Sequence, residues 1–149
     1  MLQANPVAPA LIAAIVSMMA AQLLKPFLFL LTDRRFDWRR AFDTGGMPSS
    51  HTSLVTTLTL VVAAEEGIQS SMFAVALVFS GYFVFEATGL RQEVGQQAKI
   101  LNEMVEEFVG KHQMKFDDER LRELVGHTWP EVIGGIIVGV LVFFAYGRL

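Results

Sequence analysis

The hydrophobic residues of this chain gather in long blocks. Residues 6–31 contain a single charged residue, Lys25, and residues 70–85 and 132–146 contain none. A run of about 17–25 apolar residues is long enough to cross the hydrocarbon core of a bilayer as an α-helix. A further block, residues 50–64, is shorter and rich in hydroxyl side chains, so we expect a helix that packs among the other three. The pattern predicts an all-α integral membrane bundle of about four transmembrane helices.

Composition supports this interpretation and narrows the class of partner. The chain has 149 residues, of which 52% are hydrophobic, and its mean hydropathy of +0.43 is high for a soluble globule. We expect a single membrane-embedded domain over residues 1–149. The net charge of −3 is too small to suggest a nucleic-acid partner, and the absence of cysteine excludes disulfides and thiol nucleophiles. The N-terminus lacks the positive n-region of a secretory signal, so we expect its apolar block to be retained as a helix.

The loops predict an orientation. Residues 32–47 contain four arginines and residues 91–129 contain six lysines and arginines, whereas residues 65–69 contain two glutamates and no cation. Cationic loops stay on the cytoplasmic side. We therefore expect a multi-pass protein with loops 32–47 and 91–129 inside and both chain ends outside.

The loop between the third and fourth spans is not featureless. Residues 91–109 carry an apolar stripe with a seven-residue repeat, formed by Val94, Ala98, Leu101, Val105 and Phe108. This spacing predicts an amphipathic cytoplasmic helix. It would pack on the bundle or lie on the membrane surface, and the alternative is a subunit contact in a homo-oligomer. A second short helix is expected over residues 118–125, with Gly126 as its C-terminal stop.

Polar residues mark the starts of two predicted helices. The second helix begins at Ser49, Ser50 and His51, and the last begins at His127 and is followed within one turn by Glu131. The predicted topology puts both N-terminal ends on the same membrane face. Helix N-termini present unpaired N–H groups and partial positive charge, so each favours an anion.

Two cations are expected at the same end of the bundle. Lys25 lies in the last turns of the first helix, and Arg91 ends the third. Together with two histidines and two helix N-termini, they suit a phosphate-like oxyanion, with a histidine as nucleophile or acid.

Each of these features also has a purely structural interpretation. Ser49 or Ser50 can be an ordinary N-cap, and Thr128 with Glu131 fits a capping box. Lys25 can snorkel to the membrane interface. Arg91 can be a topology signal alone. The convergence of all of them at one end of the bundle is therefore more informative than any single residue.

Three stretches resemble a known family. GGMPSSH at 45–51, TGLRQEVGQQA at 88–98 and GHTWPEVIGGIIVG at 126–139 are similar to recurring motifs of the small divergent PAP2 membrane family. The first and last also resemble signatures of the wider type 2 phosphatidic acid phosphatase superfamily, which includes vanadium haloperoxidases and acid phosphatases. The resemblance covers roughly residues 25–139.

The resemblance implies roles for individual residues. His127 would be the nucleophile that forms a phosphohistidine, His51 would protonate the leaving group, and Glu131 would orient His127. Ser49 would bind phosphate and Lys25 would match the lysine of the first signature.

The sequence also departs from the superfamily pattern. Ser50 stands where the superfamily has glycine, and the arginine expected six residues before His127 is replaced by Leu121. Arg91 or a loop arginine would have to supply that charge, which is our inference and not a motif match.

These features favour a membrane phosphatase, either a phosphomonoesterase or a pyrophosphatase. It would act on a lipid phosphate or related phosphorylated amphiphile at the cytoplasmic face. The alternative is a catalytically inactive PAP2-like membrane protein that binds a phosphorylated lipid or assembles with partners. A metal site built from His51, His127, Glu131 and Asp43 is a third interpretation, which the surrounding cations oppose. We therefore expect neither a metal nor a cofactor.

Overall fold

The part of the chain that the structure describes is mainly helical. The computed structural model describes residues 9–34, 36–43, 45–112 and 126–147, with the side chains of residues 90–92 and 109–112 outside that description. No strand occurs among these residues, as the apolar pattern predicts. The elements in order are α1 (Pro9–Asp33), the 3-10 helix η1 (Trp38–Phe42), α2 (Ser50–Glu66), α3 (Ser71–Thr88), α4 (Leu90–His112) and α5 (Trp129–Tyr146).

Three helices in the described part are long and apolar enough to cross a membrane. They are α1, the helical run Ser71–Phe108 that comprises α3 and most of α4, and α5. The three apolar blocks of the sequence correspond to these spans. With 17 residues and many hydroxyls, α2 is shorter and more polar than the three, so its crossing of the bilayer stays a prediction.

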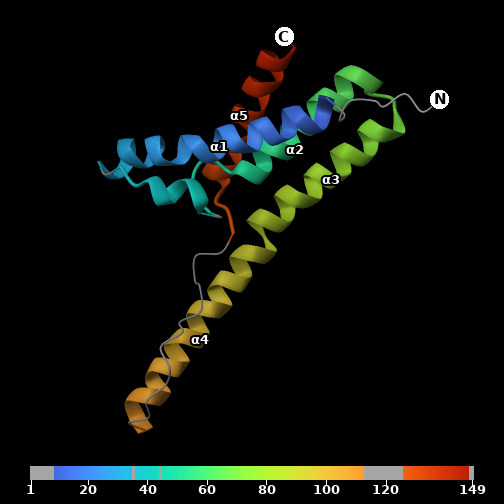
Figure 1. Ribbon diagram of the computed structural model, residues 1–149. Helices are drawn as coiled ribbons and strands as arrows, with labels where there is room; N and C mark the ends of the chain where they lie inside the picture. The colour runs from blue at the N-terminus through green and yellow to red at the C-terminus, as the bar shows by residue number, and fades with distance from the viewer. Residues whose placement is uncertain (1–8, 35, 44, 113–125, 148–149) are drawn as a thin grey trace, which may run out of the picture.

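The short helix α2 forms the centre of the bundle. It contacts α1, α3 and α5, and Figure 1 shows α1 and α2 side by side with α5 crossing them. Most of its buried side chains carry hydroxyl groups, namely those of Ser50, Thr52, Ser53, Thr57 and Thr59.

These hydroxyls bond to neighbouring helices. Ser53 Oγ lies 2.5 Å from Ser17 Oγ of α1, and Thr57 Oγ1 donates to the carbonyl oxygen of Gly139 in α5 at 3.0 Å. Thr59 Oγ1 lies 2.7 Å from Ser80 Oγ of α3. Because hydrocarbon offers no hydrogen-bonding partner, polar groups inside a membrane bundle are satisfied by other protein groups. The polar composition of α2 therefore suits a helix enclosed by three others.

Small residues let the helices approach closely. The face of α1 that is buried against the bundle consists largely of alanine and serine: Ala10, Ala13, Ala14, Ser17 and Ala21. On α5, Gly139 packs against α2 so tightly that a Cβ there would lie 2.8 Å from the carbonyl oxygen of Ser53. Such contacts supply van der Waals packing between helices where lipid leaves little hydrophobic driving force.

The amphipathic helix of the predicted cytoplasmic loop is present as α4. It continues from α3 and points away from the other helices (Figure 1), and its main contacts are with α3. The described part of α4 therefore contacts the bundle mainly through α3, and a position on the membrane surface stays a prediction. The short helix expected over residues 118–125 lies outside the described residues.

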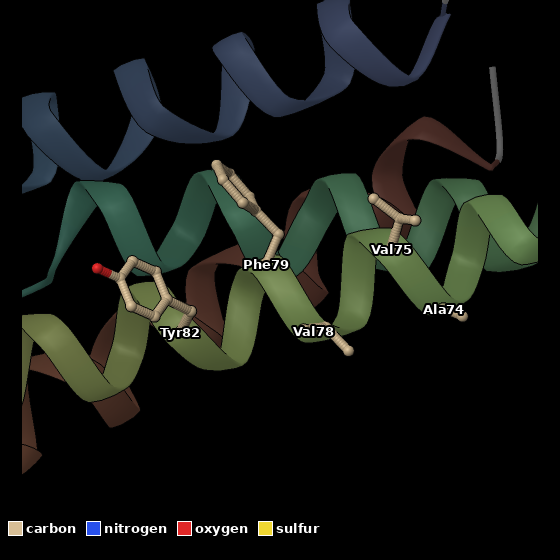
Figure 2. Close-up of a pocket in the computed structure, with 5 residues that line it drawn as sticks. All are labelled: Ala74, Val75, Val78, Phe79 and Tyr82. Carbon is tan, nitrogen blue, oxygen red and sulfur yellow. The ribbon is translucent and has the colours of Figure 1, made fainter.

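The outer face of α3 carries an open apolar hollow of about 530 Å³. Its lining consists of Ala74, Val75, Val78, Phe79 and Tyr82 (Figure 2). Exposed apolar side chains on a membrane span are the surface that lipid chains cover. The hollow contains none of the candidate site residues.

Candidate functional site

The imidazole of His127 is held by the carboxylate of Glu131. Glu131 Oε2 lies 2.8 Å from His127 Nδ1, and the histidine side chain is only 2% exposed. An ionised carboxylate can only accept a hydrogen bond, so the proton of this bond stands on Nδ1. The other ring nitrogen, Nε2, then carries the lone pair that a nucleophile or a proton acceptor requires.

The position of Glu131 follows from the start of α5. Thr128 is the N-cap residue, and its N–H donates to Glu131 Oε2 at 3.3 Å, which is the return contact of a capping box. The same carboxylate oxygen therefore caps the helix and contacts His127. The capping interpretation of Glu131 is therefore correct, and it is compatible with the prediction that Glu131 orients His127.

His51 lies opposite His127. Their ring centroids are 6.2 Å apart and the ring planes are inclined by 52°. His51 belongs to the first turn of α2 and His127 immediately precedes the N-cap of α5, so the N-terminal ends of these two helices meet. At this separation, one tetrahedral oxyanion placed beside the two rings can contact both.

The start of α2 is fixed by Ser49 and Ser50. Ser49 is the N-cap, and its Oγ accepts from the N–H of Thr52 at 3.3 Å and from the Thr52 hydroxyl at 3.0 Å. Ser49 is fully buried and Ser50, the first residue of α2, is 1% exposed. The N-cap interpretation of Ser49 is therefore correct. Its hydroxyl still has a proton to donate, so phosphate binding stays a compatible prediction.

The backbones of α2 and α5 are joined at the site. The N–H of Ser49 donates to the carbonyl oxygen of Glu131 at 2.9 Å. Gly135 makes this approach possible, since a Cβ there would lie 2.5 Å from the carbonyl oxygen of Ser49. A glycine one turn after Glu131 thus helps to hold the two helix N-termini together.

Lys25 is buried beside this junction. It is 3% exposed, and its Nζ donates to the carbonyl oxygen of Asp43 at 2.7 Å. The carboxylates of Asp43 and Glu131 are near enough to attract its ammonium group. Lys25 therefore does not snorkel to the surface but brings a positive charge to the part of the bundle that contains Glu131.

The structure locates the side chain of Arg40 but not that of Arg91. Arg91 lies in the first turn of α4, but its side chain is outside the described residues, so its role in phosphate binding stays a prediction. In the first loop, Arg40 pairs with Asp43 at 3.2 Å and lies over the ring of Phe29, 4.3 Å from its centroid. The carboxylate of Asp43 thus binds Arg40 while its main-chain carbonyl binds Lys25.

Two further groups at or near the site were not singled out from the sequence. The carbonyl oxygen of Ala87, at the end of α3, accepts from the N–H of His127 at 2.9 Å. A main-chain acceptor of this kind has no sequence signal. Gln22 Oε1 is buried in α1, one turn before Lys25, with no hydrogen-bond partner within the described part of the chain. A polar amide inside an apolar block is the signal that could have found it.

The described residues offer no cluster for a metal ion. Within residues 9–34, 36–43, 45–112 and 126–147, no three His, Asp or Glu side chains are grouped so that they could hold one. The arrangement instead combines two imidazoles, one carboxylate, one buried ammonium group and two helix N-termini. These groups can bind an oxyanion and move protons to and from it.

Comparison with known proteins places the chain in a family. The sequence profile of the divergent PAP2 family matches residues 7–142. An uncharacterized membrane protein of Bacillus subtilis (strain 168), YuiD, is 36% identical over 141 residues, which cover 89% of each chain. No solved structure matches the chain significantly. The motifs, the helical membrane bundle and these matches agree, and the chain therefore belongs to the divergent PAP2 family of membrane proteins.

Proposed function

We propose that the protein is a membrane phosphatase that acts on a lipid phosphate or a related phosphorylated amphiphile. In the first step Nε2 of His127 attacks phosphorus, the bond from phosphorus to the leaving oxygen breaks, and His51 donates a proton to that oxygen. In the second step water attacks the phosphohistidine, with His51 accepting a proton, and releases inorganic phosphate. Either a phosphomonoester or a pyrophosphate bond suits this chemistry.

One observation carries the proposal, namely that two imidazoles from two helix ends face each other and that a carboxylate fixes the orientation of one of them, His127. The 2.8 Å contact from Glu131 to Nδ1 of His127 fixes the tautomer with its lone pair on Nε2. His51 lies 6.2 Å away between ring centroids, on a different helix. A nucleophile and a general acid for one displacement need to stand on different sides of the reacting group, as two separate helix ends allow.

Fixed positive charge supports the same assignment. The buried ammonium group of Lys25 and the N-terminal ends of α2 and α5 would stabilise the charge on the equatorial oxygens of phosphorus. Arg91 is our candidate for the missing arginine of the superfamily signature. Ser49 and Ser50 would contribute hydroxyl or amide donors.

The proposal is tested by phosphate release from detergent-purified protein given lipid phosphates and lipid pyrophosphates. We expect activity that vanadate inhibits and that His127→Ala abolishes. His112→Ala is the matched control, because it removes the remaining histidine, at the far end of α4, and should leave activity unchanged. Full activity in His127→Ala would end the histidine-nucleophile mechanism.

A second candidate is a protein that binds a phosphorylated lipid without turnover. It is favoured by the absence of the signature arginine and by Lys25, which already donates to a main-chain carbonyl. Vanadate that raises the melting temperature of the wild-type protein, with no phosphate release from any substrate, would select it. A phosphohistidine trapped in acid-sensitive, alkali-stable form would reject it.

The cytoplasmic location of the site is part of the proposal and rests on the arginine-rich first loop. Because the chain has no cysteine, single-cysteine variants report topology without background. In spheroplasts, Trp38→Cys should resist a membrane-impermeant maleimide, whereas Gln69→Cys, in the opposite loop, should react. The reverse pattern would place the site on the outer face.

A further inference from the structure

Between α3 and α4 lies a single residue, Gly89. α3 ends at Thr88 and α4 begins at Leu90, so the two helices form one nearly continuous run with one irregular position. The N–H of Gly89 donates to the carbonyl oxygen of Phe85 at 2.9 Å, and its own carbonyl accepts from Glu93 at 3.1 Å. Gly89 belongs to the TGLRQEVGQQA stretch at residues 88–98. The proposed mechanism assigns a role to Arg91 of this stretch and to no other residue in it.

The interruption has a consequence at His127. The last carbonyls of an α-helix have no partner within the helix. That of Ala87, two residues before Gly89, accepts from the N–H of His127 at 2.9 Å. Both residues are buried, and His127 is the residue immediately before the N-cap of α5. The end of α3 therefore fixes the main chain of His127, while Glu131 fixes its ring.

We propose that Gly89 is a positioning residue for His127, because it ends α3 where the carbonyl of Ala87 meets the histidine N–H. The hydrogen bond holds His127 between α3 and α5 and so sets where its ring stands opposite His51. The consequence for catalysis rests on the proposed phosphatase function. The placement of His127 by Gly89 does not.

The local geometry explains why glycine serves here. A Cβ on residue 89 would lie 3.0 Å from the carbonyl oxygen of Phe85, a main-chain atom that can shift little. Alanine also favours a helix interior more than glycine does. A side chain at this position favours an unbroken helix, in which the carbonyl of Ala87 would bond to the N–H of residue 91.

Gly81 provides a matched control within α3. A Cβ on Gly81 would meet nothing within 4 Å. Gly81→Ala therefore makes the same chemical change in the same helix without disturbing its end. Gly89→Asn is an intermediate variant, since the helix propensity of asparagine lies between those of alanine and glycine.

The experiment uses full-length protein labelled with ¹⁵N-histidine in detergent. The chain has three histidines, so NMR resolves few signals, and His51→Gln and His112→Gln assign them. In the wild type, we expect the His127 amide to exchange with solvent at least tenfold more slowly than an unprotected amide. Gly89→Ala should speed this exchange at least tenfold and shift the ring ¹⁵N signals of His127. Gly89→Asn should fall between the two, and Gly81→Ala should stay within twofold of the wild type.

Activity provides a separate readout. If the wild type releases phosphate, Gly89→Ala should lower kcat at least tenfold and leave KM within threefold, because the nucleophile is displaced while the phosphate-binding groups remain. Wild-type protein without phosphatase activity would defeat the proposed function, and amide exchange would still decide the role of Gly89. An unprotected His127 amide in the wild type would overturn the inference. So would Gly89→Ala with unchanged exchange and unchanged ring signals.

Discussion

Glu131 Oε2 contacts both His127 Nδ1, at 2.8 Å, and the N–H of Thr128, at 3.3 Å. One carboxylate oxygen thus joins the start of α5 to the candidate nucleophile. The glutamate side chain reaches back from the first turn of α5 to a residue that precedes the N-cap.

Substitutions of Glu131 can distinguish its orienting contact with the His127 ring from its capping of α5. Glu131→Gln keeps an amide oxygen that can accept from Thr128, but it no longer offers a charged acceptor to the imidazole. We expect kcat for phosphate release to fall by roughly 100-fold or more, since loss of the orienting carboxylate favours the wrong tautomer, with a melting temperature close to that of the wild type. Glu131→Ala should lose activity and also about 1 kcal/mol of stability with the cap. Wild-type kcat in Glu131→Gln would remove the carboxylate from the mechanism.

Lys25 should contribute to oxyanion affinity. A charge-assisted hydrogen bond contributes about 1.5–3 kcal/mol, so Lys25→Met should weaken vanadate binding by roughly tenfold or more. Isothermal titration with vanadate measures the change. Lys99→Met is the control, because Lys99 is exposed on α4 and pairs with Glu103 at 3.9 Å. Equal affinities in the two variants would show that Lys25 only holds the carbonyl of Asp43.

Much of the fold follows from the sequence because long apolar blocks without charged residues predict membrane-spanning helices directly. The charge-free block 132–146 is suited to spanning the bilayer. The hydroxyl groups of α2 require hydrogen-bonding partners in the membrane, so they favour a helix enclosed by the others. Orientation of α4 does not follow, because an amphipathic stripe indicates that a helix has two faces and not where it points.

The candidate site is predictable only in part. The motifs name His51, His127 and Glu131, and helix ends explain why such residues gather. Their spacing, however, depends on tertiary contacts such as the close approach of Gly135 to Ser49. The hydrogen bond from the N–H of His127 to the carbonyl oxygen of Ala87 joins two main-chain groups. Almost every residue type has these groups, so no sequence pattern predicts this bond.

The glycines of α5 should set the stability of the α2–α5 contact. A Cβ on Gly139 would lie 2.8 Å from both the carbonyl oxygen of Ser53 and Cβ of Thr56. Gly139→Ala should therefore cost about 1–3 kcal/mol by overpacking, visible as a lower melting temperature in detergent. Gly81→Ala, with open space around it, should melt like the wild type. A Gly139→Ala protein as stable as the wild type would mean that α5 can move away from α2 freely.

The buried hydroxyls between α1, α2 and α5 should act as one unit. Thr57 Oγ1 lies 2.7 Å from Ser17 Oγ and 3.0 Å from the carbonyl oxygen of Gly139. Thr57→Val keeps the shape and removes these bonds, and we expect it to cost about 1–2 kcal/mol, at the upper end for hydrogen bonds inside membrane proteins.

A double-mutant cycle with Ser17→Ala tests that coupling. Because both residues belong to one network, the double variant should lose less stability than the sum of the single losses, by roughly 0.5 kcal/mol or more. Thr32→Val is the control, since its exposed hydroxyl bonds locally, to carbonyls of its own helix and to the adjacent Asp33. Strict additivity of Ser17→Ala and Thr57→Val would mean that the three helices are held by packing alone.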